Sequence, residues 1–345
     1  MITLGIETSC DETAVGIVRD GRQLLCNVVQ SQIDIHKAFG GVVPEVAARS
    51  HIEVMIPVLD EALHQTGLGW SDIDAIGVTY APGLIGSLLI GCLTARTIAI
   101  TKGIPLYPIH HIEGHVYANF LLDKQPEFPV LALIVSGGHS QLVLFEDHAH
   151  YKLLGQTQDD AVGEAFDKVA KLIGLPYPGG PSVSKAAESG NPRAYKFPKA
   201  RLAGKYDYSF SGLKTAVLRQ VQEICGKAHD YPSSRLAGLL TASQRNDIAA
   251  SFQHTAIEAL VDKTVAAYND FAPKSVVIAG GVAANTELRR QLSARLTIKV
   301  DYPPIQLCTD NGGMIAALTY YQSKQKQACD PYSLQCLPSL PMTSQ

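Results

Sequence analysis

The 345-residue chain lacks several features that would each indicate a class of protein. Its seven cysteines are odd in number and none forms a C-x-x-C pair, which argues against a disulfide framework or a cysteine zinc site. The formal net charge is −3, so nucleic-acid binding would need a local basic patch. The amino-terminal MITLGIETSCDE has no basic region and no long apolar run, so we expect no signal peptide. These absences favour a cytoplasmic protein.

One segment is apolar enough to resemble a membrane span, GLIGSLLIGCLTARTIAI at residues 83–100. Ser87, Thr94 and Arg96 interrupt it, and it is rich in glycine. We therefore expect a buried, closely packed helix rather than a span. Its small residues would allow close helix packing, either within the chain or between two subunits: Gly83, Gly86, Ser87 and Gly91.

The chain opens each half with the same local pattern. MITLGIET, a polar turn and AVGIVRD predict strand, turn and strand; VLALIVSGGHSQLVLFED repeats this after the polar, proline-containing segment 124–129. The repeat predicts an internal duplication. We expect one lobe over 1–125, a second lobe with insertions over 130–309, a last helix at about 310–325 packed back on the first lobe, and a loosely ordered tail over 328–345.

The segment HIEGH places His111 and His115 four residues apart in a predicted helix. Both imidazoles would project from one helix face, as two metal ligands or two core histidines do. Asp310, at a predicted helix start, can supply a third ligand or simply cap the helix. Glu113 lies one place later than in H-E-x-x-H and would point away from the histidines, so it is badly placed as the base of a zinc protease.

Two turns carry residues suited to anions or cations. The turn ETSCDET contains Ser9, Asp11 and Glu12, which can bind a phosphate or a cation or serve as ordinary turn residues. The turn VSGGHS contains Gly137 and Gly138, where a phosphate can approach the backbone amides, although Gly-Gly also forms a plain hairpin turn.

Three further positions follow predicted elements of the second half. Asn285 begins a helix after the buried strand SVVIAGG, where it can cap the helix or bind a ribose or base. Asp167 lies in the amphipathic GEAFDKVAKLIG, where a solvated carboxylate is the plain alternative. Gly179 and Gly180 lie in YPGGPS, which predicts either a loop able to approach a ribose or simply a turn.

The segment 193–205 is basic. It contains no acid, and its cations alternate with Tyr195 and Phe197: Arg193, Lys196, Lys199, Arg201 and Lys205. Such a segment suits an RNA backbone with an unstacked base, or else a solvated surface loop.

Several motifs occur in an order that resembles the TsaD family, the tRNA adenosine threonylcarbamoyltransferases: ETSCDETAVGIV, GGVVPEVAARSH, HHIEGH, SGGHSQLV, GEAFDKVAKLIG, YPGGP, FSGLKT, GGVAAN and CTDNGGMIA. The likeness runs from residue 2 to about 322. It implies an α/β fold of the ASKHA type (actin, sugar kinase and Hsp70), with duplicated ribonuclease-H-like halves and an inter-lobe cleft. It also implies transfer of the threonylcarbamoyl group from threonylcarbamoyl-adenylate to N6 of adenosine 37, with release of AMP. The acceptors would be tRNAs that read codons beginning with adenine.

The resemblance implies one divalent metal ion, iron or zinc, bound by His111, His115 and Asp310. It places the adenylate against a set of eight residues: Ile134, Val135, Ser136, Gly137, Gly138, Asp167, Gly180 and Asn285. The partners it implies are tRNA, a TsaB-type paralogous subunit and a TsaE-type P-loop ATPase, with no membrane. Asp11 and Glu12 are both candidates for orienting the donor or accepting a proton.

Three other functions compete with this transferase. A metallopeptidase would need a glutamate beside the first histidine, which the sequence lacks. A sugar-kinase-like or ATP-hydrolysing protein is compatible with the implied fold. A non-catalytic scaffold would not need the three candidate metal ligands, which are all present.

Overall fold

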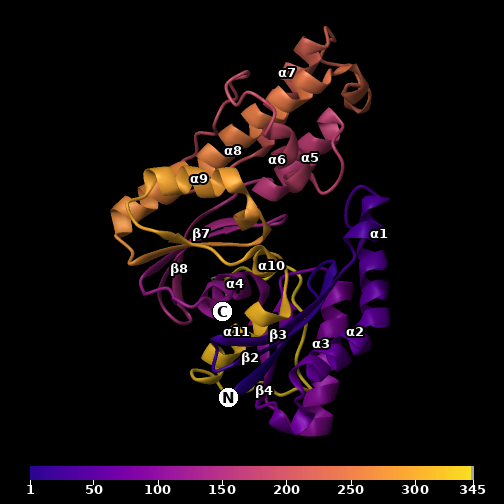
Figure 1. Ribbon diagram of the computed structural model, residues 1–345, viewed down its shortest axis with the longest axis vertical. Coiled ribbons are helices and arrows are strands. Elements are labelled where there is room, and N and C mark those ends of the chain that lie inside the picture. The colour runs from indigo at the N-terminus through magenta and orange to yellow at the C-terminus, as the bar shows by residue number, and fades with distance from the viewer. Residues whose placement is uncertain (343–345) are drawn as a thin grey trace. The chain divides into compact units, whose positions relative to one another are not determined.

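The chain forms two compact units in the computed structural model, which describes residues 1–342. Unit 1 comprises Met1–Phe128, Phe145–Lys152 and the chain from Asp301 onward, and unit 2 comprises Pro129–Leu144 and Leu153–Val300. Figure 1 shows the chain with the α-helices and several strands of both units labelled.

Unit 1 contains a five-stranded sheet in the order β3-β2-β1-β4-β5. Its strands are β1 (Ile2–Glu7), β2 (Glu12–Arg19), β3 (Gln23–Ser31), β4 (Ala75–Ala81) and β5 (Leu106–His110). β1 pairs antiparallel with β2 and parallel with β4. Its strands β1 and β2 are buried almost throughout, which requires helices on both faces of the sheet.

Strand alternation explains how both faces are covered. Leu4, Ile6 and Ile17 belong to a core cluster with residues of helices α2 (Pro44–Thr66) and α3 (Ile85–Lys102). Gly5 and Gly16, which pair with each other, project to the other face. The remaining helical elements of unit 1 are α1 (Ile33–Lys37), η1 (Trp70–Asp72), α4 (His111–Tyr117), η2 (Ala118–Leu121), α10 (Ile305–Cys308) and α11 (Gly312–Ser323).

Helix α11 packs directly on the backbone of β1 and β2. A Cβ added to Gly16 would lie 2.2 Å from the Gly313 amide nitrogen, and one added to Gly5 would lie 2.3 Å from that of Ala316. Thr3 Oγ1 also donates to the Ala316 carbonyl at 2.9 Å. Only glycine permits this approach, so the first two strands fix the position of a helix almost 300 residues later in the chain.

Helix α3 is buried on one face only, whereas we expected a buried helix. Its length and composition would suit a membrane span, but a third of its 18 residues are buried inside the protein. The side chains Ile85, Leu89 and Leu93 are 54%, 45% and 45% exposed, at four-residue steps along one face. The small residues point inward: a Cβ on Gly83, Gly86 or Gly91 would meet Ser9, Ala48 or Thr8 of the same chain, respectively.

Unit 2 repeats the topology of unit 1. The second sheet, most of which belongs to unit 2, has the strands β6 (Val130–Val135), β7 (Ser140–Asp147), β8 (His150–Gln156), β9 (Ser275–Ala279) and β10 (Val300–Asp301), in the order β10-β9-β6-β7-β8. Read from β8, this is the order of unit 1, with β9 parallel to β6 as β4 is to β1. The duplicated α/β fold is therefore confirmed.

The helical elements of unit 2 include α8, which is 30 residues long and begins with a capping box at Thr241 and Gln244. The elements are α5 (Val162–Ile173), α6 (Gly179–Ala187), α7 (Ser211–Ile224), η3 (Ser233–Arg235), η4 (Ala237–Leu239), α8 (Ala242–Phe271), η5 (Gly281–Ala284) and α9 (Thr286–Arg295). Gly179 and Gly180 begin α6 rather than lying in a loop, so that expectation was wrong.

The carboxy-terminal tail is bound to unit 1, so the expectation of a loosely ordered tail is wrong for the described part that ends at Met342. The Cys329 amide donates to the Leu106 carbonyl on β5, and the Leu337 amide donates to the carbonyl of Tyr80 at the end of β4, both at 2.9 Å. Arg96 donates to the Pro331 carbonyl at 2.5 Å. Carbonyls of the strands thus accept from tail amides, and α3 donates to a carbonyl that the proline-containing backbone of the tail leaves available. Residues 343–345 lie outside the described part.

Candidate functional site

The structure brings His111, His115 and Asp310 together. His111 is the first residue of α4, directly after β5, and His115 lies one helical turn later. Asp310 lies just before α11, whose packing on β1 and β2 carries it to the histidines. Both histidines are buried, and the candidate ligand atoms all lie within 4.8 Å of one another.

The spacing of these atoms fits a metal ion. Asp310 Oδ1 lies 3.2 Å from His115 Nε2 and 3.6 Å from His111 Nε2. Ligands at ~2.1 Å around a tetrahedral ion would be about 3.4 Å apart. Within residues 1–342, neither buried ring nitrogen of His115 makes a hydrogen bond, although Nε2 lies close to Asp310. A buried imidazole without hydrogen bonds, facing a carboxylate, is the arrangement expected of a cation site.

Glu7 supports this group and was missed in the sequence. It is fully buried at the end of β1, and its Oε2 lies 3.0 Å from His111 Nδ1. Ser9 Oγ lies 3.1 Å from the same nitrogen. With its proton on Nδ1, His111 donates to Glu7 and presents Nε2 toward Asp310. The sequence signal was a charged residue that ends an otherwise uncharged strand.

The electrostatics of the group favour a cation. Burial by itself lowers the pKa of His111, but the charges of Glu7 and Asp310 outweigh it and raise that pKa to about 9. Burial by itself raises the pKa of Glu7, but the charge and hydrogen bond of His111 hold it below its usual value. The two carboxylates thus create a negative potential around the imidazoles.

The first turn lies close to the same group. Burial, followed by the charges of Asp310 and Asp11, raises the pKa of Glu12 well above its usual value. Glu12 Oε1 also accepts a hydrogen bond from Ser31 Oγ at 3.2 Å. Neither Asp11 nor Glu12 belongs to the candidate ligand group, so both are available for other roles.

Glu113 does not join the ligand group, although it lies between the two histidines in sequence. Its side chain is buried, burial raises its pKa to about 7, and within residues 1–342 neither carboxylate oxygen accepts a hydrogen bond. The group therefore lacks the adjacent glutamate base of a zinc protease.

The other candidate residues gather in unit 2 at the carboxyl ends of the parallel strands β6 and β9. Ile134 and Val135 are fully buried, so only their backbone can reach a ligand. The Ser136 amide donates to the His139 carbonyl at 2.8 Å, which leaves Gly137 and Gly138 as the exposed amides of the turn.

Contacts link this turn to the helices that carry the remaining candidates. The Gly163 amide in α5 donates to the Ser136 carbonyl at 3.3 Å. Asp167, also in α5, accepts from the Gly179 amide at 2.6 Å, which places Gly180 beside it in α6. Apart from adjacent residues of the same segment, no atom of residues 1–342 lies within 4 Å of a Cβ added to Gly180, Gly137 or Gly138, so a ligand can approach all three.

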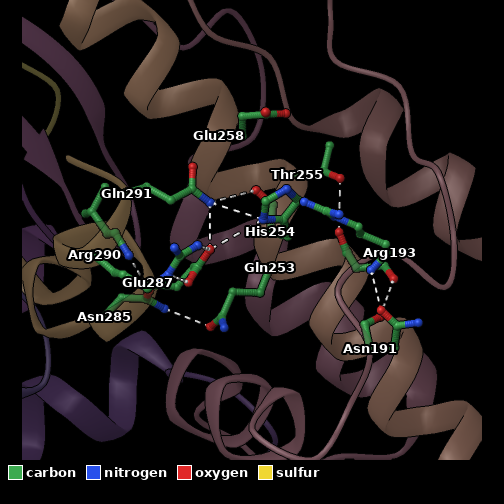
Figure 2. Close-up of polar contacts among 12 residues, drawn as sticks. Asn191, Arg193, Gln253, His254, Thr255, Glu258, Asn285, Glu287, Arg290 and Gln291 are labelled. Atoms are coloured by element: carbon green, nitrogen blue, oxygen red, sulfur yellow. Dashed lines mark hydrogen bonds and ion pairs between the residues drawn. The ribbon is translucent and has the colours of Figure 1, made fainter. Parts of the chain in front are cut away.

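Asn285 joins α9 to α6 and α8. Its Oδ1 caps α9 by accepting from the Leu288 amide at 3.0 Å. Its Nδ2 donates to Ser184 Oγ and to Gln253 Oε1, both at 3.0 Å. Figure 2 shows Asn285 beside Gln253, with Glu287, Arg290 and Gln291 forming a neighbouring polar network. Capping is therefore one role of Asn285, and its Nδ2 must exchange a partner to bind a ligand.

Comparisons with solved structures show the fold. The chain resembles HypF from T. kodakarensis with a TM-score of 0.60 and 13% identity, covering 94% of this chain and 48% of that chain. It resembles the activator of 2-hydroxyisocaproyl-CoA dehydratase from Clostridium difficile with a TM-score of 0.51 and 15% identity, covering 96% and 100%. These likenesses support the ASKHA type of fold.

Sequence comparisons show the family. The profile of the TsaD family, tRNA N6-adenosine threonylcarbamoyltransferase, matches residues 23–317. Proteins with that name from Thermomicrobium roseum and Symbiobacterium thermophilum are each 49% identical; the matches cover 96% and 93% of this chain and 94% and 91% of theirs. With the His-His-Asp group and the duplicated fold in place, the chain belongs to the TsaD family of tRNA N6-adenosine threonylcarbamoyltransferases.

Proposed function

We propose that this protein transfers the threonylcarbamoyl group of threonylcarbamoyl-adenylate to N6 of adenosine 37 in tRNAs that read codons beginning with adenine. The observation that carries the proposal is the convergence of His111, His115 and Asp310 in a chain of this family. In the reaction, N6 forms a bond to the carbamoyl carbon and loses a proton. The bond from that carbon to the phosphate oxygen breaks, and AMP leaves.

The acceptor amine is a poor nucleophile because its lone pair is delocalised into the adenine ring. Catalysis therefore depends on positioning the donor and stabilising charge on it. A divalent ion, iron or zinc, held by the two histidines and Asp310 would supply Lewis acidity toward donor oxygens. Glu7 would keep the Nε2 of His111 directed at that ion.

The unit 2 residues suit the adenylate part of the donor. Gly137 and Gly138 are exposed, and the space where a side chain would lie is open among residues 1–342, so their amides can donate to its phosphate. Asp167 uses Oδ1 for the Gly179 amide, which leaves Oδ2 to accept from a ribose hydroxyl near Gly180. Asn285 can donate to the ribose or base if Nδ2 releases Ser184 or Gln253.

Asp11 and Glu12 are the candidates for accepting the N6 proton or orienting the donor. Single-turnover transfer by Asp11→Asn and Glu12→Gln separates them. The proton acceptor should show a lower transfer rate with unchanged metal content and donor affinity. If both variants transfer at the wild-type rate, neither carboxylate has this role.

The direct test uses purified, metal-loaded protein with threonylcarbamoyl-adenylate and unmodified tRNA. Mass spectrometry of the nucleosides should show threonylcarbamoyladenosine, in amounts equal to the AMP released. Cells depleted of the protein should lose the same nucleoside. Unchanged threonylcarbamoyladenosine in depleted cells would contradict the proposal. ADP formation from ATP with a metabolite, or peptide cleavage abolished by His111→Ala, would instead support a kinase or a peptidase.

The exposed apolar face of α2 and α3 suits a protein partner. Ile52 and Ile56 on α2 are 62% and 60% exposed, and they add to the α3 face of Ile85, Leu89 and Leu93. The two helices pack against each other at Ala48 and Gly86. We assign this face to the TsaB-type paralogous subunit, because apolar patches of this kind mark protein interfaces. The family resemblance supports a TsaE-type ATPase as a second partner. It also supports the cytoplasm as the location of the protein.

A further inference from the structure

A cavity of about 950 Å³ lies in unit 2 between the segment 192–209 and one face of α8. We call it the α8 cavity. His254, Glu258 and Asp262 line it at four-residue steps, so a single face of the long helix forms one wall. None of the candidate metal or adenylate residues lines it, so it is a separate feature of the molecule.

The wall opposite α8 is held in place by two of its own lysines. Lys199 Nζ lies 3.0 Å from Glu258 and 2.5 Å from Asp262. Lys205 Nζ lies 2.5 Å from Asp270. The acids of α8 thus neutralise part of the basic segment, which the sequence alone could not show. Lys199 and Lys205 serve to attach this wall to the helix.

Three other cations of the same wall remain available to bind an anionic ligand. Arg193, Lys196 and Arg201 are exposed, line the cavity and form no ion pair with any residue in 1–342. Figure 2 shows Arg193 near Asn191, whose carbonyl accepts from Ser251 of α8 at 3.1 Å. Of the charged residues that line the cavity, six are basic and three are acidic. The cavity is therefore positive in a chain whose net charge is −3.

The cavity also presents an aromatic ring. Tyr195 lines it and is half-buried, with its backbone fixed by a hydrogen bond from its amide to Ser251 Oγ at 3.1 Å. Its ring centroid lies 6.5 Å from that of Phe197. Exposed cations beside a positioned aromatic ring match the way proteins bind single-stranded RNA, with phosphates on the cations and a base against the ring.

We propose that the α8 cavity binds a backbone segment of the tRNA substrate, with phosphates at Arg193, Lys196 and Arg201 and an unstacked base against Tyr195. This inference rests on the proposed function for the identity of the RNA. A polyanion fits better than a single small anion because the cations are exposed and spread over nine residues. Exposed cations contribute little one by one and act together through the release of counterions.

The test compares the triple variant Arg193→Ala, Lys196→Ala, Arg201→Ala with a control that removes three exposed lysines of unit 2 outside the cavity: Lys171, Lys227 and Lys299. Equilibrium binding of unmodified tRNA is measured from 50 to 200 mM salt. The slope of log affinity against log salt is negative, and its magnitude should decrease by about 2 in the triple variant, as expected for three lost phosphate contacts. Its Kd should rise roughly 10- to 100-fold at the lower salt, since each contact adds to the salt-dependent part of the affinity. The control should keep a slope and a Kd near those of the wild type.

Tyr195→Ala should weaken binding severalfold without changing the salt slope, because stacking releases no counterions. Thermal unfolding and metal content should match the wild type in every variant. A triple variant with the wild-type slope, and a Kd within twofold of the control, would overturn the inference. Equal loss of binding to polyglutamate and to tRNA would also overturn it, by showing a general anion surface. Absence of threonylcarbamoyladenosine with wild-type protein would instead contradict the proposed function, whatever the binding data show.

Discussion

Replacing Glu7 with glutamine tests the arrangement behind the candidate metal group. The carboxylate accepts three hydrogen bonds in a fully buried site: from the Ser9 amide and Thr79 Oγ1, both at 2.5 Å, and from His111 Nδ1 at 3.0 Å. A glutamine side chain has one oxygen and one NH2 group. At least one of the three donors would therefore face an NH2 group instead of an acceptor.

Two effects of Glu7→Gln can be expected from this geometry. Loss of the outer partner of a metal-bound histidine typically weakens metal binding 10- to 100-fold, or about 1.4 to 2.7 kcal/mol. Leaving a buried donor unpaired should also lower the stability of the metal-free protein by about 1 to 3 kcal/mol. Weaker metal binding would follow from the changed orientation of His111. General destabilisation explains only the lower stability of the metal-free protein.

The assay is metal affinity by competition with a chromophoric chelator, well below the unfolding temperature of each variant. Glu113→Gln is the matched control, because Glu113 is also a buried glutamate of unit 1 but accepts no hydrogen bond within residues 1–342 and is not in the ligand group. It should keep the wild-type affinity. A metal Kd for Glu7→Gln within twofold of the wild type would refute the role of Glu7 in positioning His111.

Four further outcomes are expected. Asp310→Ala should abolish stoichiometric metal, measured by elemental analysis, with little change in metal-free Tm; retained metal would remove Asp310 from the ligands. The Gly180→Ala variant should fold normally, because the surroundings of Gly180 are open, and should lose affinity for the adenylate in calorimetry. The Gly179→Ala variant should instead have a lower Tm, because the new Cβ would lie 2.4 Å from the Asp167 backbone. Burial by itself raises the pKa of Glu287, but hydrogen bonds from Arg290 and Gln291 outweigh it and hold that pKa at about 2, below its usual 4.5. The stability that ionised Glu287 adds to the folded protein is therefore present above pH 4.5 and is lost as the pH falls toward 2. Glu287→Gln should thus cost roughly 1 kcal/mol at pH 7 in urea unfolding, after allowing for solvent screening of Arg290, and progressively less as pH falls; a constant difference would contradict this. Leu89→Glu should abolish binding of the paralogous subunit in size-exclusion chromatography without lowering Tm, since Leu89 is 45% exposed; unchanged binding would place the partner elsewhere.

Short-range patterns in the sequence predicted most of the elements correctly. The hairpins β1–β2 and β6–β7, the amphipathic helix α5 and the helix bearing His111 and His115 all depend on neighbours within a few residues. Periodicity and turn chemistry determine such elements locally. The repeated hairpin was also enough to predict the duplication that the two sheet orders confirm.

Only the tertiary structure decided which residues meet. Asp310 reaches the histidines because Gly5 and Gly16 let α11 rest on the sheet backbone, and Glu7 reaches His111 because β1 ends beside the start of α4. The acids that pair with Lys199 lie about 60 residues away on α8. The exposed face of α3 depends on which side of the helix the sheet covers. Sequence periodicity specifies an element and its apolar side, but contacts between distant residues follow from how closely the elements pack, which no short stretch of sequence contains.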